Sequence, residues 1–417
     1  MRGRLCIFCF LLCAFPANAA EEFAASFRLR GGYDSNPLLA PGGKGSALIA
    51  WEAGVAYGRD HGDWITGATG EASLTRYQKQ EFEPVQSYRL RLRLANKNRS
   101  DIAIDATTTL ARASNCDMRS EFVNQRVHLQ RADGDLLPFV AGDLRLASLN
   151  ELNILLGDFL PQPMRYLRGT ITPGIAYVKD KSEAGISIAF SKTKYDEALD
   201  VFGFRRDNDR LQTAAYAKYG GDDLALSGAL SFLRIPSQDE FFTDVNAMLF
   251  DVSFAAKLES WNAEVSFART AEDTTFPVSP VTINTALQAK ISRDLNGKTT
   301  AGIFGRMLQR KYWDAPLFSR TRVAGIEVSH EVFEDVRIAG EFAFARSLLI
   351  SGAEAEGVIA TLALTKRFGE GGKKKEIGAG GAGIGTARRN ASDRRFAFCR
   401  MRGGTWCFRQ PSAARGD

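Results

Sequence analysis

The sequence predicts an all-β fold, a transmembrane antiparallel up-and-down β-barrel of about 16–18 strands. Three observations support this prediction. Roughly eighteen segments between Phe23 and Phe368 alternate apolar and polar residues with the period of two that is typical of strands. Short and long connections alternate between these segments, as expected for short periplasmic turns and longer external loops. An apolar N-terminal segment indicates export.

Residues 1–20 are expected to be a secretory signal peptide. Arg2 and Arg4 precede the apolar run Leu5–Phe15, and the small residues after it supply a cleavage site before Glu21. This run is too short to span a bilayer. The alternative interpretation is a buried apolar N-terminal helix.

The charge of the chain is unevenly divided. The formal net charge of +6 separates into +2 for the signal peptide, −3 for residues 21–368 and +7 for residues 369–417. The basic character therefore belongs to the tail, and it gives no support for nucleic-acid binding by the body. No segment after the N-terminus is long and uncharged enough for a transmembrane helix.

The tail, Gly369–Asp417, differs from the body in composition. It begins with a Gly- and Lys-rich linker and continues as an Arg-rich segment without clear periodicity, so we expect disorder. It is either a basic periplasmic tail that contacts anionic lipid or peptidoglycan, or an extension that is not native. Of the 6 cysteines only Cys116 lies in the body, which excludes a disulfide framework there.

The clearest strand pattern is Tyr88–Leu94, YRLRLRL, in which one face is apolar and the other carries three arginines. Similar alternation recurs at Phe23–Arg30, Leu48–Tyr57, Met248–Ala255 and Val336–Ala345. The eighth segment contains Pro173, which has no N–H to donate to a ladder.

The last segment, Glu356–Phe368, has an almost entirely apolar face and ends in an aromatic residue. This pattern resembles the closing strand of an outer-membrane barrel, although an edge strand of a soluble sheet alternates in the same way. The alternating connection lengths upstream favour barrel closure. Lys366 is expected on the lipid side, two residues before the terminal aromatic.

The first segment ends in the motif Gly31–Pro37, GGYDSNP, an aromatic residue followed by turn formers. This motif resembles the GYDSN-type opening of porin-like outer-membrane β-barrel proteins. The resemblance implies a barrel fold and, for some members, association with exopolysaccharide or surface-protein export. The helical-repeat region that some such exporters carry is not found in this sequence.

The polar alternates should face the lumen, because an arginine on the lipid side at the bilayer midplane costs roughly 2–4 kcal/mol. The arginines expected to line the pore are Arg28, Arg30, Arg89, Arg91, Arg93, Arg126, Arg306 and Arg337. The acidic residues expected on the same face are Glu52, Asp105, Asp251, Glu264, Glu327 and Glu341. The arginines would favour anions in the pore. Alternatively, they pair with the acids and only make the wall rigid.

The connection Ala147–Met164 has apolar residues at helical spacing, from Leu149 to Phe159, and two prolines after them. We expect a helix that folds against the inner wall or the barrel mouth and narrows the pore. The alternatives are an external cap or a pair of strands.

Enzymatic motifs are not found. His61, His128 and His330 each lack a second ligand at metal-site spacing, and the sequence has no zinc-binding, nucleophile-elbow or phosphate-loop pattern. We therefore expect no catalytic residue, metal or cofactor; a barrel hydrolase is the least favoured hypothesis.

Together these observations predict a passive or weakly anion-selective pore for small solutes in the outer membrane of a Gram-negative bacterium. The alternative is a non-enzymatic barrel of a polysaccharide or surface-protein export system. The expected partners are outer-membrane lipid, the barrel-assembly machinery, and either small anionic solutes or a periplasmic export partner.

Overall fold

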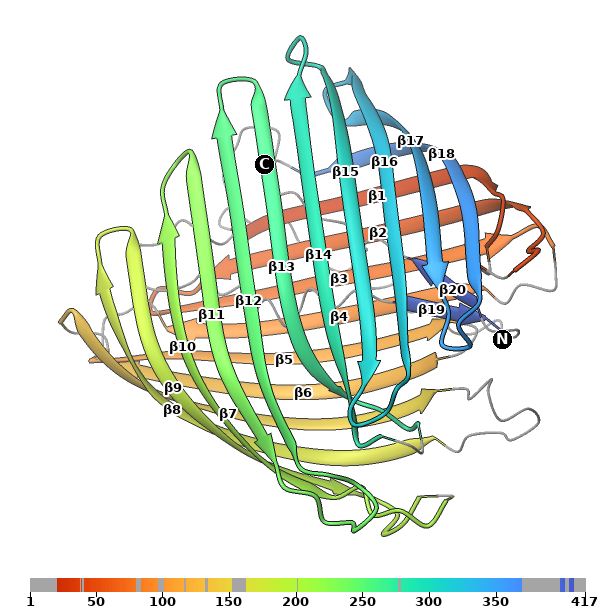
Figure 1. The fold of residues 1–417 in the computed structure, drawn as a ribbon. Coiled ribbons are helices and arrows are strands. Elements are labelled where there is room, and N and C mark those ends of the chain that lie inside the picture. Colours follow the sequence, from red (N-terminus) through yellow and green to blue (C-terminus); the bar gives the residue numbers. More distant parts are fainter. Residues whose placement is uncertain are drawn as a thin grey trace, which may run out of the picture.

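The computed structural model describes residues 21–369, apart from 38, 40, 80–83, 97–100, 116–117, 132–133, 152–162, 201 and 277–278, together with 398–401 and 405–408. Among these residues no helix is long and apolar enough to cross a membrane. Eighteen strands form one antiparallel sheet. β1 (Glu21–Asp34) pairs with both β2 (Ser46–Asp60) and β18 (Glu354–Phe368), which closes the sheet into a barrel (Figure 1).

The predicted barrel and its strand number are confirmed. The other strands are β3 (Trp64–Tyr77), β4 (Val85–Asn96), β5 (Ile102–Asn115), β6 (Met118–Arg131), β7 (Leu136–Glu151), β8 (Met164–Lys179), β9 (Ser182–Tyr195), β10 (Asn208–Gly220), β11 (Leu224–Ile235), β12 (Val245–Leu258), β13 (Trp261–Asp273), β14 (Val281–Asp294), β15 (Thr299–Tyr312), β16 (Phe318–Phe333) and β17 (Val336–Leu348).

The exterior of the barrel is apolar because one alternate of each strand is apolar. In β4 the side chains of Tyr88, Leu90 and Leu92 are exposed, whereas the arginines between them are partly covered. Leu362 of β18 is 63% exposed, and Phe368 is 48% exposed. A continuous surface of this kind is suited to lipid acyl chains, and closure leaves no unpaired edge in the hydrocarbon region.

The connections alternate in length as predicted. The end of the barrel where Ala25 lies opposite Phe368 has short turns, such as the two residues 180–181 and 259–260. The other end has the long connections, which place it outside the cell. We call four of these loops L1 (35–45), L5 (196–207), L6 (236–244) and L7 (274–280). One connection at this end breaks the pattern, because β5 and β6 are separated by only two residues.

The predicted faces of the closing strand are also as expected. Leu362 and Leu364 lie on the exposed side with Phe368, in phase with Lys366. The Lys366 ammonium lies 5.2 Å from the centre of the Phe368 ring. A cation over an aromatic ring at the membrane interface keeps its charge solvated and covers apolar surface.

The GYDSN segment joins β1 to β18 beyond the end of their regular ladder. The Ser35 N–H donates to the carbonyl of Val358 at 2.9 Å, and the Val358 N–H donates to the Ser35 hydroxyl at 2.7 Å. The Asn36 amide donates to the Glu356 carbonyl at 2.9 Å, while the Asn36 N–H donates to the Asp34 carboxylate at 3.0 Å. This anchoring directs L1 toward the barrel interior.

The helix expected over Ala147–Met164 is wrong at both of its described ends. β7 continues to Glu151, and Leu149 pairs with Met164 in the β7–β8 ladder. Residues 149–151 therefore extend the strand, because pairing with β6, and for Leu149 also with β8, satisfies their backbone groups. Leu152, Leu155, Leu156 and Phe159 lie outside the described residues.

Pro173 is accommodated within β8 by a local interruption. It lies opposite Val140 in the ladder with β7, whereas the ladder with β9 omits Thr172 and Pro173. A separate two-stranded sheet is formed by β19 (Phe398–Met401) and β20 (Thr405–Phe408). The rest of the tail and the expected signal peptide lie outside the described residues, so both assignments stay predictions.

Candidate functional site: an arginine-lined lumen crossed by a hairpin

The strand registers identify the inner face of the wall. Directly opposed residues of an antiparallel ladder point to the same side. Arg91 is opposite Thr109, which is opposite Asn124. Asn124 is opposite Arg145, which is opposite Arg168. Because Arg168 reaches a side chain of β13, five strands further along, this face is the lumen.

All eight arginines predicted from the sequence share this inner face: Arg28, Arg30, Arg89, Arg91, Arg93, Arg126, Arg306 and Arg337. The six predicted acids share it as well: Glu52, Asp105, Asp251, Glu264, Glu327 and Glu341. Six arginines lie on β4 and β6–β8 together. We call the inner face of β4–β8 the arginine wall, defined by Arg89, Arg91, Arg93, Arg126, Arg145 and Arg168.

The inner arginines differ in their contacts. Arg93 binds Asp105 closely, with Nη2 at 2.8 Å and Nε at 3.1 Å from Oδ2. Arg28 is more loosely paired, since its Nη1 lies 4.0 Å from Glu52 Oε2. The Arg145 guanidinium lies over the Phe122 ring, 4.6 Å from its centre. Pairing with lumen acids, the alternative interpretation above, therefore occurs at Arg93.

The end of the β13–β14 hairpin leaves the wall. The ladder between β12 and β13 stops where Phe250 lies opposite Arg269, although the β13–β14 ladder continues to Asp273 opposite Val281. Beyond Arg269 the hairpin passes behind β12 on the lumen side. There Val281 and Ile283 pack against the inner face of β11 and β12, at Leu233, Ile235, Val245, Ala247 and Leu249.

Two arginines of the opposite wall hold the tip of this hairpin. Arg168 Nη2 donates to both carboxylate oxygens of Asp273, at 2.8 and 2.7 Å, and Arg210 Nη2 also binds this carboxylate. Arg168 Nε donates to Thr193 Oγ1 at 2.7 Å, and the guanidinium stacks on the Tyr166 ring. The Asp273 side chain is only 7% exposed. Two cations and one carboxylate, all hydrogen-bonded, make a buried charge tolerable.

A third arginine fixes the backbone of L7. Arg206 of L5 donates through Nη1 to the Ser279 carbonyl at 2.7 Å and through Nη2 to the Phe276 carbonyl at 3.1 Å. Its Nε binds Asp200 at 2.8 Å, and its guanidinium lies over the Phe242 ring. The side chains of Arg206 and Asp200 are almost fully buried. L7 is therefore held across the lumen by L5.

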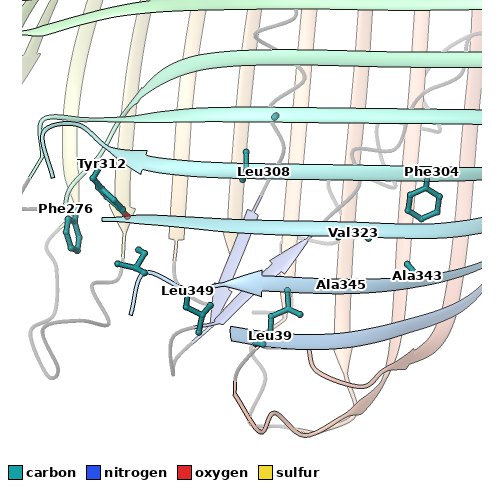
Figure 2. Close-up of a cluster of buried hydrophobic side chains, with 12 residues drawn as sticks. Leu39, Phe276, Phe304, Leu308, Tyr312, Val323, Ala343, Ala345 and Leu349 are labelled. Carbon is teal, nitrogen blue, oxygen red and sulfur yellow. The ribbon is translucent and has the colours of Figure 1, made fainter. Parts of the chain in front are cut away.

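On the other side of the lumen, L7 and L1 pack on an apolar surface. We call this surface the apolar wall; it is the inner face of β15–β18 near the external end, with Phe304, Leu308, Tyr312, Val323, Ala343, Ala345 and Ala355. Figure 2 shows Phe276 of L7 beside Tyr312, with Leu39 of L1 and Leu349 nearby. The hairpin thus spans the lumen from the apolar wall to Arg168 and Arg210, and it narrows the passage.

Sequence reasoning missed the residues that hold the hairpin. Arg168 and Arg210 each lie next to an exposed leucine and could have been found from that alternation. Asp273 is in phase with Val265 and Phe267, which face lipid, so alternation alone would place it outside. A carboxylate on a lipid-facing alternate is the signal that the strand departs from the wall.

The histidines have other contacts in the structure. His61 Nε2 lies 3.1 Å from Thr66 Oγ1, and His330 Nδ1 lies 2.9 Å from Thr299 Oγ1. His128, on the inner face of β6, packs on the ring of Phe139. Within the described part of the chain, no group of three or more His, Cys, Asp or Glu residues could hold a metal ion.

No protein-family model and no curated protein matches the sequence. Several solved outer-membrane barrels are similar in fold. OccK9 (OpdG) of Pseudomonas aeruginosa aligns with a TM-score of 0.46 and 12% identity, over 84% of this chain and 98% of that chain. OccAB4 of Acinetobacter baumannii gives 0.42 and 8%, over 85% and 100%. The siderophore receptor PirA of P. aeruginosa gives 0.42 and 9%, over 84% and 81%. These values describe a likeness of fold, and no solute follows from them.

A closed antiparallel barrel with an apolar exterior and a charged interior is the architecture of a Gram-negative outer-membrane protein. This chain is an 18-stranded barrel of that class, and the external part of its lumen is crossed by its own β13–β14 hairpin.

Proposed function

We propose that this barrel is a passive pore for small solutes with a preference for anions. The observation that carries the proposal is the charge of the arginine wall. Six arginines lie on the inner face of β4–β8, against Asp105 and Asp143 as the described acids of the same face. Guanidinium groups lining a low-dielectric passage raise the local concentration of anions and lower that of cations.

The hairpin that crosses the lumen supports the same proposal. It covers the apolar wall and leaves the arginine wall facing the remaining passage, so a solute would move along charged rather than apolar side chains. Arg168 binds Asp273, and the other members of the arginine wall lie on the same inner face. Insertion through the barrel-assembly machinery is part of this proposal. The export alternative has no supporting observation in the described residues.

The proposal is tested with the full-length precursor expressed in an outer membrane and the processed barrel reconstituted in planar bilayers. We expect stable channels whose reversal potential in a KCl gradient indicates chloride preference. In the variant Arg89→Gln/Arg91→Gln/Arg93→Gln the reversal potential should move toward zero, while the channels persist.

The matched control replaces three arginines on the outer face, Arg76→Gln/Arg112→Gln/Arg234→Gln. Each of them lies directly opposite an exposed hydrophobic residue of the neighbouring strand. This control should keep the original reversal potential. A correctly inserted barrel that never conducts would overturn the pore, and conductance with equal selectivity in both triple variants would overturn the role of the arginine wall.

A further inference from the structure

The outer face of β15–β17 carries a group of cations at its external end. Arg322 of β16 lies directly opposite Arg346 of β17, and Met307 of β15 lies on its other side. Two positions nearer the periplasm, Ala324 lies opposite Phe344, which is exposed to lipid. The arginines therefore mark the external border of the apolar belt, at the level of the outer-leaflet headgroups.

A third cation extends this group along the same border. Arg320 is in phase with Arg322, so it also lies on the outer face. Arg320 Nη2 is 3.3 Å from Gln309 Oε1, and its guanidinium lies 5.9 Å from the centre of the Phe318 ring. We call Arg320, Arg322 and Arg346 the rim cations.

The protein supplies too few anions for these three cations. Arg346 binds both Glu354 and Glu356 of β18. Among the described residues no carboxylate binds Arg322, although a second guanidinium stands opposite it on the same face. Like charges directly opposed across a ladder are destabilising, and an arginine facing lipid needs a partner or water. The group thus has an excess of positive charge on a membrane-facing surface.

The periplasmic border is built differently. There the Arg293 guanidinium lies 5.2 Å from the centre of the Trp261 ring, and Lys366 lies at the same distance over Phe368. Each of these cations is single and covers an aromatic ring. The opposed arginine pair therefore belongs to the external border, where the headgroups are those of the outer leaflet.

We propose that the rim cations bind the phosphate groups of a phosphorylated, acylated glycolipid of the outer leaflet. Planar guanidinium groups bind phosphate oxygens through paired hydrogen bonds. The exposed apolar residues directly below, Phe344, Phe342 and Ile326, offer a surface for its acyl chains. A ligand that satisfies both features must carry phosphate at the headgroup and hydrocarbon beneath it, which excludes a free anion as the natural occupant.

The test uses the full processed chain in detergent micelles, with diphosphorylated lipid A as the probe and binding measured by native mass spectrometry. In Arg320→Gln/Arg322→Gln/Arg346→Gln we expect at least about tenfold weaker binding, because each lost charge-assisted hydrogen bond alone has that order of effect. The control Arg59→Gln/Arg293→Gln/Lys366→Gln removes three outer-face cations from the periplasmic border and should bind as the unaltered chain does.

A second variant keeps the proposal testable if the triple substitution prevents folding. Glu354→Gln/Glu356→Gln releases Arg346 and should strengthen binding several-fold. Unchanged affinity in both rim variants, or equal binding of lipid A without its phosphates, would overturn the proposal. Binding of inorganic phosphate to the rim cations as tight as that of lipid A would also overturn it, since the site would then be one for free anions. Channel conductance is not part of this readout, so the result is independent of the proposed pore.

Discussion

The arginine wall and the apolar wall face each other across the same lumen, yet the chain uses them in opposite ways. Loops L1 and L7 pack on the apolar wall, where Phe276, Leu39 and Tyr312 are almost fully buried. The arginine wall is contacted by the hairpin at Arg168, through one carboxylate. Burial of apolar area stabilises the first contact, at about 25 cal/mol per Å², whereas the second depends on charge pairing.

The difference between apolar packing on one wall and charge pairing on the other explains how the barrel holds the β13–β14 hairpin inside its lumen. An infolded hairpin needs an apolar surface to pack on and a specific contact that fixes where its tip ends. β15–β18 supply the surface, and Arg168, Arg210 and Arg206 supply the fixed contacts. The part of the arginine wall that is not used for this purpose remains for solute.

The largest effect is expected from removing the carboxylate that links the two walls. Asp273→Ala leaves Arg168 and Arg210 buried without their anion, and breaking a buried pair of this kind costs about 3–5 kcal/mol. The tip of the hairpin should detach, so single-channel conductance should rise and become noisier while the unfolding midpoint in urea falls. Glu264→Gln, an exposed acid on the inner face of the same strand, is the control. Unchanged conductance in Asp273→Ala would show that the hairpin does not narrow the passage.

The second effect is expected at the apolar wall. Phe276 is 7% exposed and its ring centre lies 4.6 Å from that of Tyr312, so Phe276→Ala should cost about 3 kcal/mol through lost burial and a cavity. Urea unfolding in micelles measures this loss. Leu199→Ala in L5, where the side chain is half exposed, should change stability by no more than about 0.5 kcal/mol. Equal losses in the two variants would mean that L7 is not packed on the wall.

The two walls also differ in how far the sequence predicts them. The period-two pattern of YRLRLRL correctly identifies the inner face of β4, since each arginine alternates with a lipid-facing residue. The same alternation identifies the strand that ends at Phe368 as the last one, and this strand closes the barrel by pairing with β1. These features are local, and neighbouring strands determine them.

The hairpin could not be predicted in this way. Its position depends on contacts that β13 makes with β8 and β10. Neither of these strands is a neighbour of β13 in the sheet. Alternation gives the face of a residue relative to its neighbours only while the strand stays in the wall, and β13 leaves it after Arg269. The two described ends of the helix expected over Ala147–Met164 were wrong for a related reason, since Leu149, the first apolar residue of the helical spacing, pairs with Met164 of β8.

A smaller effect is expected within the arginine wall itself. The Arg93 and Asp105 side chains are 31% and 36% exposed, so Arg93→Gln should cost only about 0.2–1 kcal/mol of stability. Its effect on selectivity should be larger, with the reversal potential moving toward zero. Asp105→Asn, which removes the opposite charge from the same pair, should move it the other way. Shifts in the same direction would mean that geometry, rather than charge, sets the preference.

The smallest effect concerns the loops beside the hairpin and depends on pH. The Asp239 carboxylate of L6 accepts hydrogen bonds from the N–H groups of Arg205, in L5, and Phe241, which lowers the pKa of Asp239 below its ordinary value. A lowered folded-state pKa contributes stability above the unfolded value of about 3.9 and loses it as pH falls further. Amide exchange at Arg205 and Phe241, corrected for intrinsic rates, should therefore stay protected from pH 7 to 5 and weaken only below about pH 4.

The Gly221 amide offers an internal reference for this measurement, because it donates to the Leu224 carbonyl and no carboxylate takes part. Its protection should not follow the titration of Asp239. In Asp239→Asn the acid-dependent step at Arg205 should disappear, since the amide that replaces the carboxylate does not titrate. A step that persists in this variant would assign the acid response to another group. Arg206, the next residue, would then have to be tested separately, because its contacts with Ser279 and Phe276 fix L7 independently of Asp239.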